Sequence, residues 1–85
     1  MTFDAAVIEE QGVTFAVVIV ESSAVKDLIS TLQTQHHFST IFPDMPIILL
    51  TLASGGVPLY YGSTDIVKSL VKTPLSGIPF QQYTV

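Results

Sequence analysis

The sequence predicts an α+β domain in which a single mixed or antiparallel sheet of about four to five strands packs with two helices in two layers. Two segments, residues 13–21 and 46–54, are apolar on both faces, as central strands are. Two other segments combine a serine or threonine start with apolar residues at helical spacing. The expected element order is ββαββα, with a further strand at the end. With 85 residues, the chain forms one small domain, residues 1–85.

The first half of the chain predicts a hairpin followed by a helix. A strand over residues 3–9 leads to a tight turn at Gly12, and Val13–Glu21 returns as the second strand. Ser22 and Ser23 are expected to cap the helix, because a serine hydroxyl can accept a bond from a free amide of the first turn. The apolar stripe of this helix consists of Val25, Leu28, Ile29 and Leu32, and the helix is expected to fray around residues 35–38.

The second half predicts the same arrangement. After the strand Pro46–Ser54, Gly55 and Gly56 make a turn, and residues 57–62 return as a short strand. Pro58 has no amide hydrogen to donate, which favours an edge position. Ser63 or Thr64 caps the second helix, which Pro74 ends; its apolar stripe is Ile66, Val67, Leu70 and Val71. Residues 80–85 are expected to add a terminal strand.

The two halves resemble an internal repeat, with "SSAVKDLIS" and "STDIVKSLV" sharing the cap and the Val-Lys order. The packing of such a sheet leaves two alternatives, because both central strands are apolar on both faces. Either the helices divide between the faces, or a second subunit covers a bare face. We favour a homodimer formed through an apolar sheet face or edge, and an unidentified protein partner is a further option.

Composition excludes several classes of function. The chain has three lysines, no arginine and a net charge of −4, so it cannot form the basic stripe that nucleic acids require. No cysteine is present for disulfides, thiol catalysis or metal ligation. The apolar runs are shorter than the about 20 residues that span a bilayer, and the first residues lack the basic region of a signal peptide. We expect no membrane association and a cytoplasmic location.

One candidate binding site is the glycine-rich segment Gly55–Asp65 together with the two helix starts. Free amides at a glycine turn and a helix N-terminus can hold an anion. The candidate ligand-binding residues are Ser22, Ser23, Gly55, Gly56, Ser63 and Thr64. The segment matches neither specific phosphate-binding fingerprint, and Asp65 would repel an anion. We therefore favour a hairpin turn and a helix cap here.

A second candidate is an interface at Pro58, Tyr60 and Tyr61. On a strand, the two tyrosines point to opposite faces, so one packs inward and the other lies exposed at or near the sheet edge. An exposed tyrosine supplies rigid contact area and a hydroxyl, and is common at protein interfaces.

The sequence provides little support for catalysis or metal binding. His36 and His37 are adjacent, with Asp44 as the sole nearby carboxylate, and neighbouring helix positions point about 100° apart. Glu9 and Glu21 could form a carboxylate pair if the hairpin brought them together, but no nucleophile, base and orienting group accompany them. The sequence predicts no cofactor, no metal and no catalytic residue.

The sequence therefore favours a non-enzymatic, self-associating protein-interaction or regulatory module. The alternative is a small-ligand-binding domain that uses the Gly55–Asp65 turn and helix N-terminus. A third interpretation is a degenerate enzyme domain that has lost its active residues.

Overall fold

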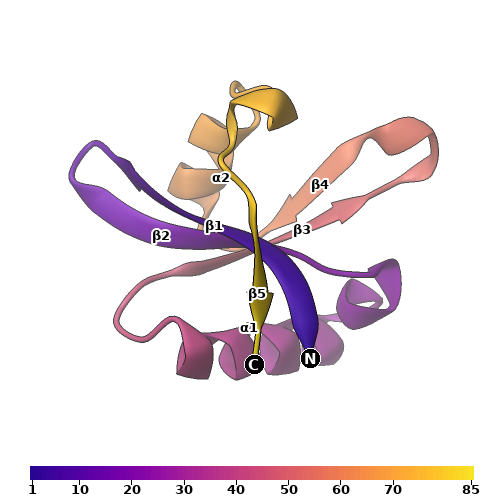
Figure 1. Ribbon diagram of the computed structural model, residues 1–85. Coiled ribbons are helices and arrows are strands. Elements are labelled where there is room, and N and C mark those ends of the chain that lie inside the picture. The colour runs from indigo at the N-terminus through magenta and orange to yellow at the C-terminus, as the bar shows by residue number, and fades with distance from the viewer.

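The computed structural model describes residues 1–85 and shows one mixed sheet with two helices, in the predicted order (Figure 1). The strands are β1 (Thr2–Glu10), β2 (Val13–Ile19), β3 (Ile47–Leu52), β4 (Pro58–Tyr61) and β5 (Gln81–Thr84). The helices are α1 (Leu28–Ile41) and α2 (Thr64–Leu70), and short 3₁₀ turns cover Ser22–Val25, Ser54–Gly56 and Leu75–Gly77. The α+β class and the terminal strand are confirmed.

The sheet order is β4-β3-β2-β1-β5, so that the two strands predicted to be central, β2 and β3, lie side by side. They run parallel, and each pairs antiparallel with the other strand of its own hairpin. Because strand side chains alternate between faces, Val18 and Leu49 point to one face, while Val17 and Leu50 point to the other. All four are completely buried, which explains why these segments are apolar on both faces.

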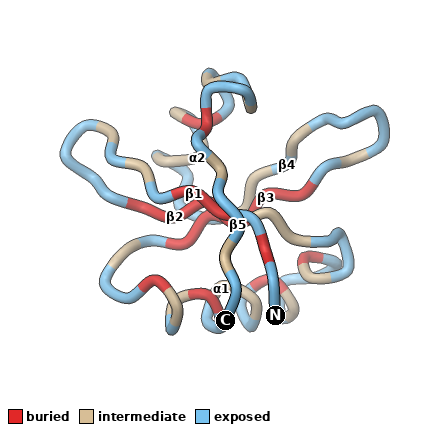
Figure 2. The backbone as a smooth tube through the Cα atoms, in the orientation of Figure 1, coloured by how far each residue is buried: buried red, intermediate tan, exposed pale blue.

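The two helices lie on opposite faces of the sheet, with α1 below it and α2 above it in Figure 1. Phe38 of α1 belongs to the core on one face, and Leu70 of α2 to the core on the other. Buried segments accordingly lie along the middle of the sheet (Figure 2). The molecule thus has three layers rather than the two expected. Of the two packing alternatives, the helices divide between the faces, and the central strands need no second subunit to cover them.

The start of α1 differs from the sequence prediction. Ser22 and Ser23 belong to a 3₁₀ turn without a side-chain cap, and the residue that caps α1 is Asp27. The Ser30 backbone N–H donates to Asp27 Oδ1 at 2.7 Å. Asp27 has an extended backbone with φ −152°. The extended backbone of Asp27 separates the 3₁₀ turn from α1. Val25 and Leu28 therefore do not lie on one continuous helix.

The Asp27 cap gives the fold a component of stability that depends on pH. The hydrogen bond from the Ser30 backbone N–H, followed by that from the Ser30 side chain, lowers the pKa of Asp27 below its usual value. A lowered pKa in the folded state means that the contribution is present above about pH 4 and is lost as the pH falls through the folded-state pKa.

We expect Asp27→Ala to lower the melting temperature at pH 7, because the amide of Ser30 loses its acceptor, and to cost less near pH 2. Asp27→Asn keeps an acceptor without the titrating charge, so its melting temperature should vary less between pH 5 and pH 2. Thermal unfolding followed by circular dichroism across this pH range measures both effects. An equal loss for Asp27→Ala at both pH values would contradict the assignment.

The buried face of α1 also differs from the prediction. Thr31 and Phe38 are buried, whereas Leu28, Ile29 and Leu32 are exposed. Thr31 Oγ1 donates to the Asp27 carbonyl at 2.8 Å, and Thr34 Oγ1 donates to the carbonyls of Ser30 and Ala24. Local acceptors therefore satisfy the hydroxyl groups on the sheet-facing side. The helix does not fray at residues 35–38 but continues to Ile41, where Phe42 N–H donates to the Phe38 carbonyl.

The second half follows its prediction more closely. The 3₁₀ turn Ser54–Gly56 joins β3 to β4, and Ala53 N–H donates to the Val57 carbonyl at 2.8 Å. Strand β4 is an edge strand, as Pro58 predicted. Ser63 is the residue before α2 but makes no side-chain cap bond. Neither helix is both long enough and apolar enough to cross a membrane.

Candidate interaction surface

Exposed apolar side chains gather where α1 runs beside the edge strand β4. Leu28, Ile29 and Leu32 on α1 expose 73%, 69% and 54% of their surface, although leucine and isoleucine commonly lie inside proteins. On β4, Leu59 is also exposed, and Tyr61 packs only partly against the α1-side core. We call these five residues and Tyr60 the α1–β4 surface. Leu28 and Leu32 line one groove with Tyr60 and Tyr61, and exposed apolar residues gathered in this way are typical of an interaction site.

The free edge of β4 presents backbone groups without partners in the sheet. Ala53 bonds to Val57, so Leu59 and Tyr61, two and four residues further on, also direct their backbone groups toward β3. The N–H and C=O of Tyr60 consequently point away from the sheet. The Gly62 N–H donates no hydrogen bond. Pro58 faces the same edge and offers a carbonyl group alone.

Tyr60 and Tyr61 lie on opposite faces of the sheet, as the strand alternation predicted. Tyr60 packs at the margin of the α2-side core and Tyr61 at the margin of the α1-side core. Partial burial of the phenol raises the pKa of Tyr60 above its usual value, because the charged form is less well solvated there. Each tyrosine therefore packs partly against a core and leaves part of its side chain exposed at the edge of the domain.

A groove separates α1 from β4 on this side of the molecule. One section, of about 530 Å³, is lined by both tyrosines, Gly62 and Ser63 on one side and by Leu28, Thr31, Leu32 and Gln35 on the other. A second section of about 370 Å³ continues along α1 past Leu32 and Gln35 to His36 and Met45. At the floor, Gln35 Nε2 lies 3.4 Å from the Ile47 carbonyl and 3.5 Å from the Tyr61 carbonyl. Gln35 thus donates to two backbone carbonyls at the point where β4 leaves β3.

The α1–β4 surface carries no charge. Between Leu28 and Thr64 the sequence contains one charged residue, Asp44, and it lies in the connection between α1 and β3. The other charged residues belong to β1, the segment before α1, α2 and the turn after α2. Charged side chains and prolines at sheet edges normally oppose pairing with another chain. Strand β4 has no charged side chain, and Pro58 is its one residue of this kind.

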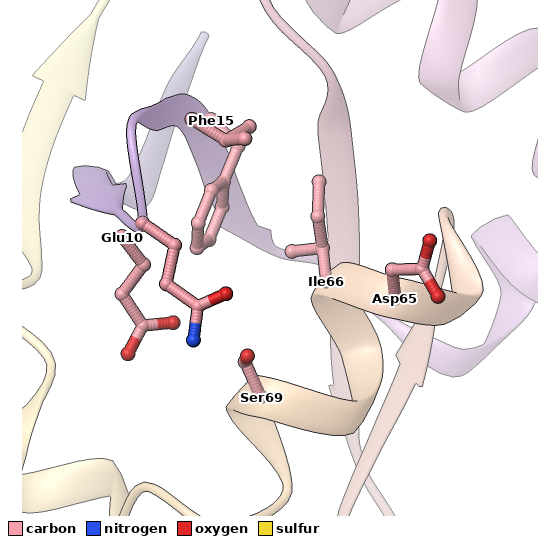
Figure 3. A pocket seen from close by; sticks show the side chains of 7 residues that line it. Glu10, Phe15, Asp65, Ile66 and Ser69 are labelled. Carbon is pink, nitrogen blue, oxygen red and sulfur yellow. The ribbon is translucent and has the colours of Figure 1, made fainter.

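A separate small cavity lies between the β1–β2 turn and α2 (Figure 3). It encloses about 110 Å³, and its walls include Glu10, Phe15, Asp65, Ile66 and Ser69. Glu10 Oε2 is shielded from solvent and accepts no hydrogen bond. Small-molecule sites usually measure about 300–1,000 Å³, so this cavity has room for water or a small ion rather than an organic ligand.

The residues proposed for ligand binding lie on three separate elements. Gly55 and Gly56 form the exposed tip of the β3–β4 hairpin, and Ser22 and Ser23 lie in the 3₁₀ turn before α1. Ser63 alone lines the groove, while Thr64 begins a helix of seven residues. The three interface candidates do lie together, since Pro58, Tyr60 and Tyr61 all belong to β4.

Two further groupings considered in the sequence are not formed. Glu9 pairs with Thr14 beside the Gly12 turn, whereas Glu21 follows the opposite end of β2, so the hairpin holds these carboxylates apart. His36 and His37 lie on exposed positions of α1. No group of three or more His, Asp or Glu side chains is placed to hold a metal ion.

Sequence reasoning missed the apolar stripe of α1 as a surface. Its spacing predicts burial, since an apolar stripe usually faces the core. A signal was nevertheless present in Phe38 and Phe42, whose large side chains fix a different face of α1 against the sheet. Comparison with protein-family models, curated proteins and solved structures finds no match for this chain.

Proposed function

We propose that this protein is a non-enzymatic module that self-associates through the α1–β4 surface and acts as a protein-interaction or regulatory partner. The observation that carries the proposal is the exposed, uncharged stripe of Leu28, Ile29 and Leu32 on α1. Of these, Leu28 and Leu32 line the groove beside the free edge of β4. Burial of a large aliphatic side chain contributes about 1.5–3 kcal/mol, so this stripe offers a substantial gain on association.

The charge distribution is compatible with a second copy of the chain as the partner at the α1–β4 surface. Each molecule carries a net charge of −4, so two copies repel each other through most approaches. The uncharged α1–β4 surface permits contact with the least repulsion. We also place the module in the cytoplasm, because a secreted domain of this size more often uses disulfides, and this chain has no cysteine.

Size-exclusion chromatography with multi-angle light scattering tests the proposal directly. The chain has a mass of 9.2 kDa, and we expect twice this value at micromolar concentrations. Self-association should persist or strengthen at higher ionic strength, because salt screens the repulsion between the two negatively charged copies. A mass of one chain throughout the micromolar range would contradict self-association.

A further inference from the structure

We infer that the second copy docks edge to edge, with β4 antiparallel to β4 of the partner and Tyr60 on the two-fold axis. This inference rests on the proposed function and specifies the arrangement of its interface. In such a dimer the two sheets join into one, and the same strand contributes both sides of the junction. The partner is thus a second copy of this chain rather than a peptide of unrelated sequence.

The donors and acceptors along the outer edge of β4 favour one register of pairing. Antiparallel strands related by a two-fold axis place each residue opposite a residue at the mirrored distance from that axis. With Tyr60 on the axis, its outward N–H and C=O meet the same groups of the partner's Tyr60 and form two hydrogen bonds. Pro58 then lies opposite the partner's Gly62, so the Pro58 carbonyl accepts from the free Gly62 N–H.

This register suits the missing donor of Pro58. Each copy has two outward N–H groups near the axis, on Tyr60 and Gly62, and both find acceptors. Shifting the axis by one residue, to Leu59 or Tyr61, would centre the junction on backbone groups already bonded to β3. The edge is therefore complementary to itself in this register.

The second step concerns the helices. A two-fold axis perpendicular to the sheet keeps each face of the sheet on its own side, so both copies of α1 lie on the same side of the joined sheet. Leu28 and Leu32 line the groove beside β4 and would face the corresponding groove of the partner. A standard interface buries about 800 Å² on each partner. Strand pairing alone is short, since β4 spans Pro58–Tyr61, so the apolar stripe of α1 supplies the remaining area.

The opposite edge of the sheet lacks these features. Strand β5 has the sequence QQYT, and its two glutamines are exposed. The groove beside Leu28 and Leu32 is lined by no residue of β5. We therefore expect the dimer to form through β4 and not through β5.

The absence of cysteine makes single-cysteine cross-linking a clean test. Directly opposed residues in a bonded antiparallel pair have Cα atoms about 5.5 Å apart, within the range of a disulfide. We expect mild oxidation to link most Tyr60→Cys chains into covalent dimers. Val57→Cys would stand about 20 Å from its symmetry mate, given about 3.4 Å per strand residue. Val57→Cys and Gln82→Cys, on β5, should therefore remain largely unlinked.

Amide hydrogen exchange of the unmodified protein provides a second measurement that does not depend on the Tyr60→Cys variant folding. The Tyr60 and Gly62 amides should exchange at least about 10-fold more slowly when the protein is concentrated from the monomeric to the dimeric range. The Leu59 amide faces β3 within the same chain and should depend less on concentration.

The outcomes separate this inference from the proposed function. A single-chain mass at every concentration refutes both. A dimer that links through Gln82→Cys, or that leaves the Tyr60 and Gly62 amides unprotected, refutes the β4 arrangement while self-association stands. A dimer that links at Tyr60→Cys alone and protects both amides supports the inferred register.

Discussion

Gly62→Ala is expected to destabilise the fold by about 2–4 kcal/mol, through a steric clash and backbone strain together. A Cβ atom added at Gly62 would lie 2.5 Å from Ile48 Cδ1 and 3.2 Å from the Ile47 carbonyl oxygen. Ile48 is completely buried, so its side chain has little freedom to move away. Gly62 also has φ +154°, which side chains of L-residues rarely adopt. This glycine lets the chain leave β4 close against β3 before α2 begins.

Gly55→Ala is the matched control for Gly62→Ala. Gly55 has φ +79°, but no atom lies within 4 Å of the position of an added Cβ. Its cost should therefore be limited to backbone strain, about 1–2 kcal/mol. Denaturant unfolding at one fixed protein concentration compares the variants, because self-association would make stability depend on concentration. Equal losses at the two sites would show that the contact with Ile48 is unimportant.

The class of fold and the central strands could be predicted from the sequence because local patterns report them directly. Residues 13–19 and 47–52 are apolar on both faces, and this pattern belongs to strands covered on both sides. Pro58 placed β4 at the edge because the missing amide hydrogen is a property of the residue itself. The same reasoning predicted that Tyr60 and Tyr61 face opposite sides, as they do.

The buried face of α1 could not be predicted by counting apolar spacing alone. Val25 and Leu28 have the spacing of one helical stripe, but the extended backbone of Asp27 interrupts the helix between them. Phe38, further along α1, then decides which side meets the sheet, and this choice depends on packing across the whole domain. Burial of Thr31 follows from a hydrogen bond to the Asp27 carbonyl, which composition does not reveal.

The placement of the helices on opposite faces likewise required the tertiary structure. The sequence showed that both faces of the sheet needed covering but did not say whether α2 or a second subunit would cover the second face. Since α2 packs Leu70 there, the sheet faces are covered and the α1–β4 surface is the candidate for association. Pro58, Tyr60 and Tyr61 belong to the β4 edge, whereas the candidate ligand residues Gly55 and Gly56 lie at the hairpin tip.

Replacement of either Leu28 or Leu32 by glutamate should dissociate the proposed dimer while leaving the monomer folded. Each leucine is more than half exposed in the single chain, so the substitution removes little from its core. In a two-fold dimer each change occurs twice, and a loss of about 1.5 kcal/mol for each buried leucine amounts to about 3 kcal/mol. The dissociation constant of either single variant should therefore rise by at least about 100-fold.

Val71→Glu is the matched control, because Val71 is 64% exposed and lies just after α2, on the opposite face of the sheet from α1. It adds the same charge as the leucine variants, so a general effect of net charge would weaken association in all three. Sedimentation equilibrium of the three variants measures their dissociation constants, and circular dichroism verifies that each is folded. A buried carboxylate without a partner opposes association far more strongly than an exposed one. A Leu28→Glu protein that dimerises as tightly as the Val71→Glu protein would therefore place the interface elsewhere.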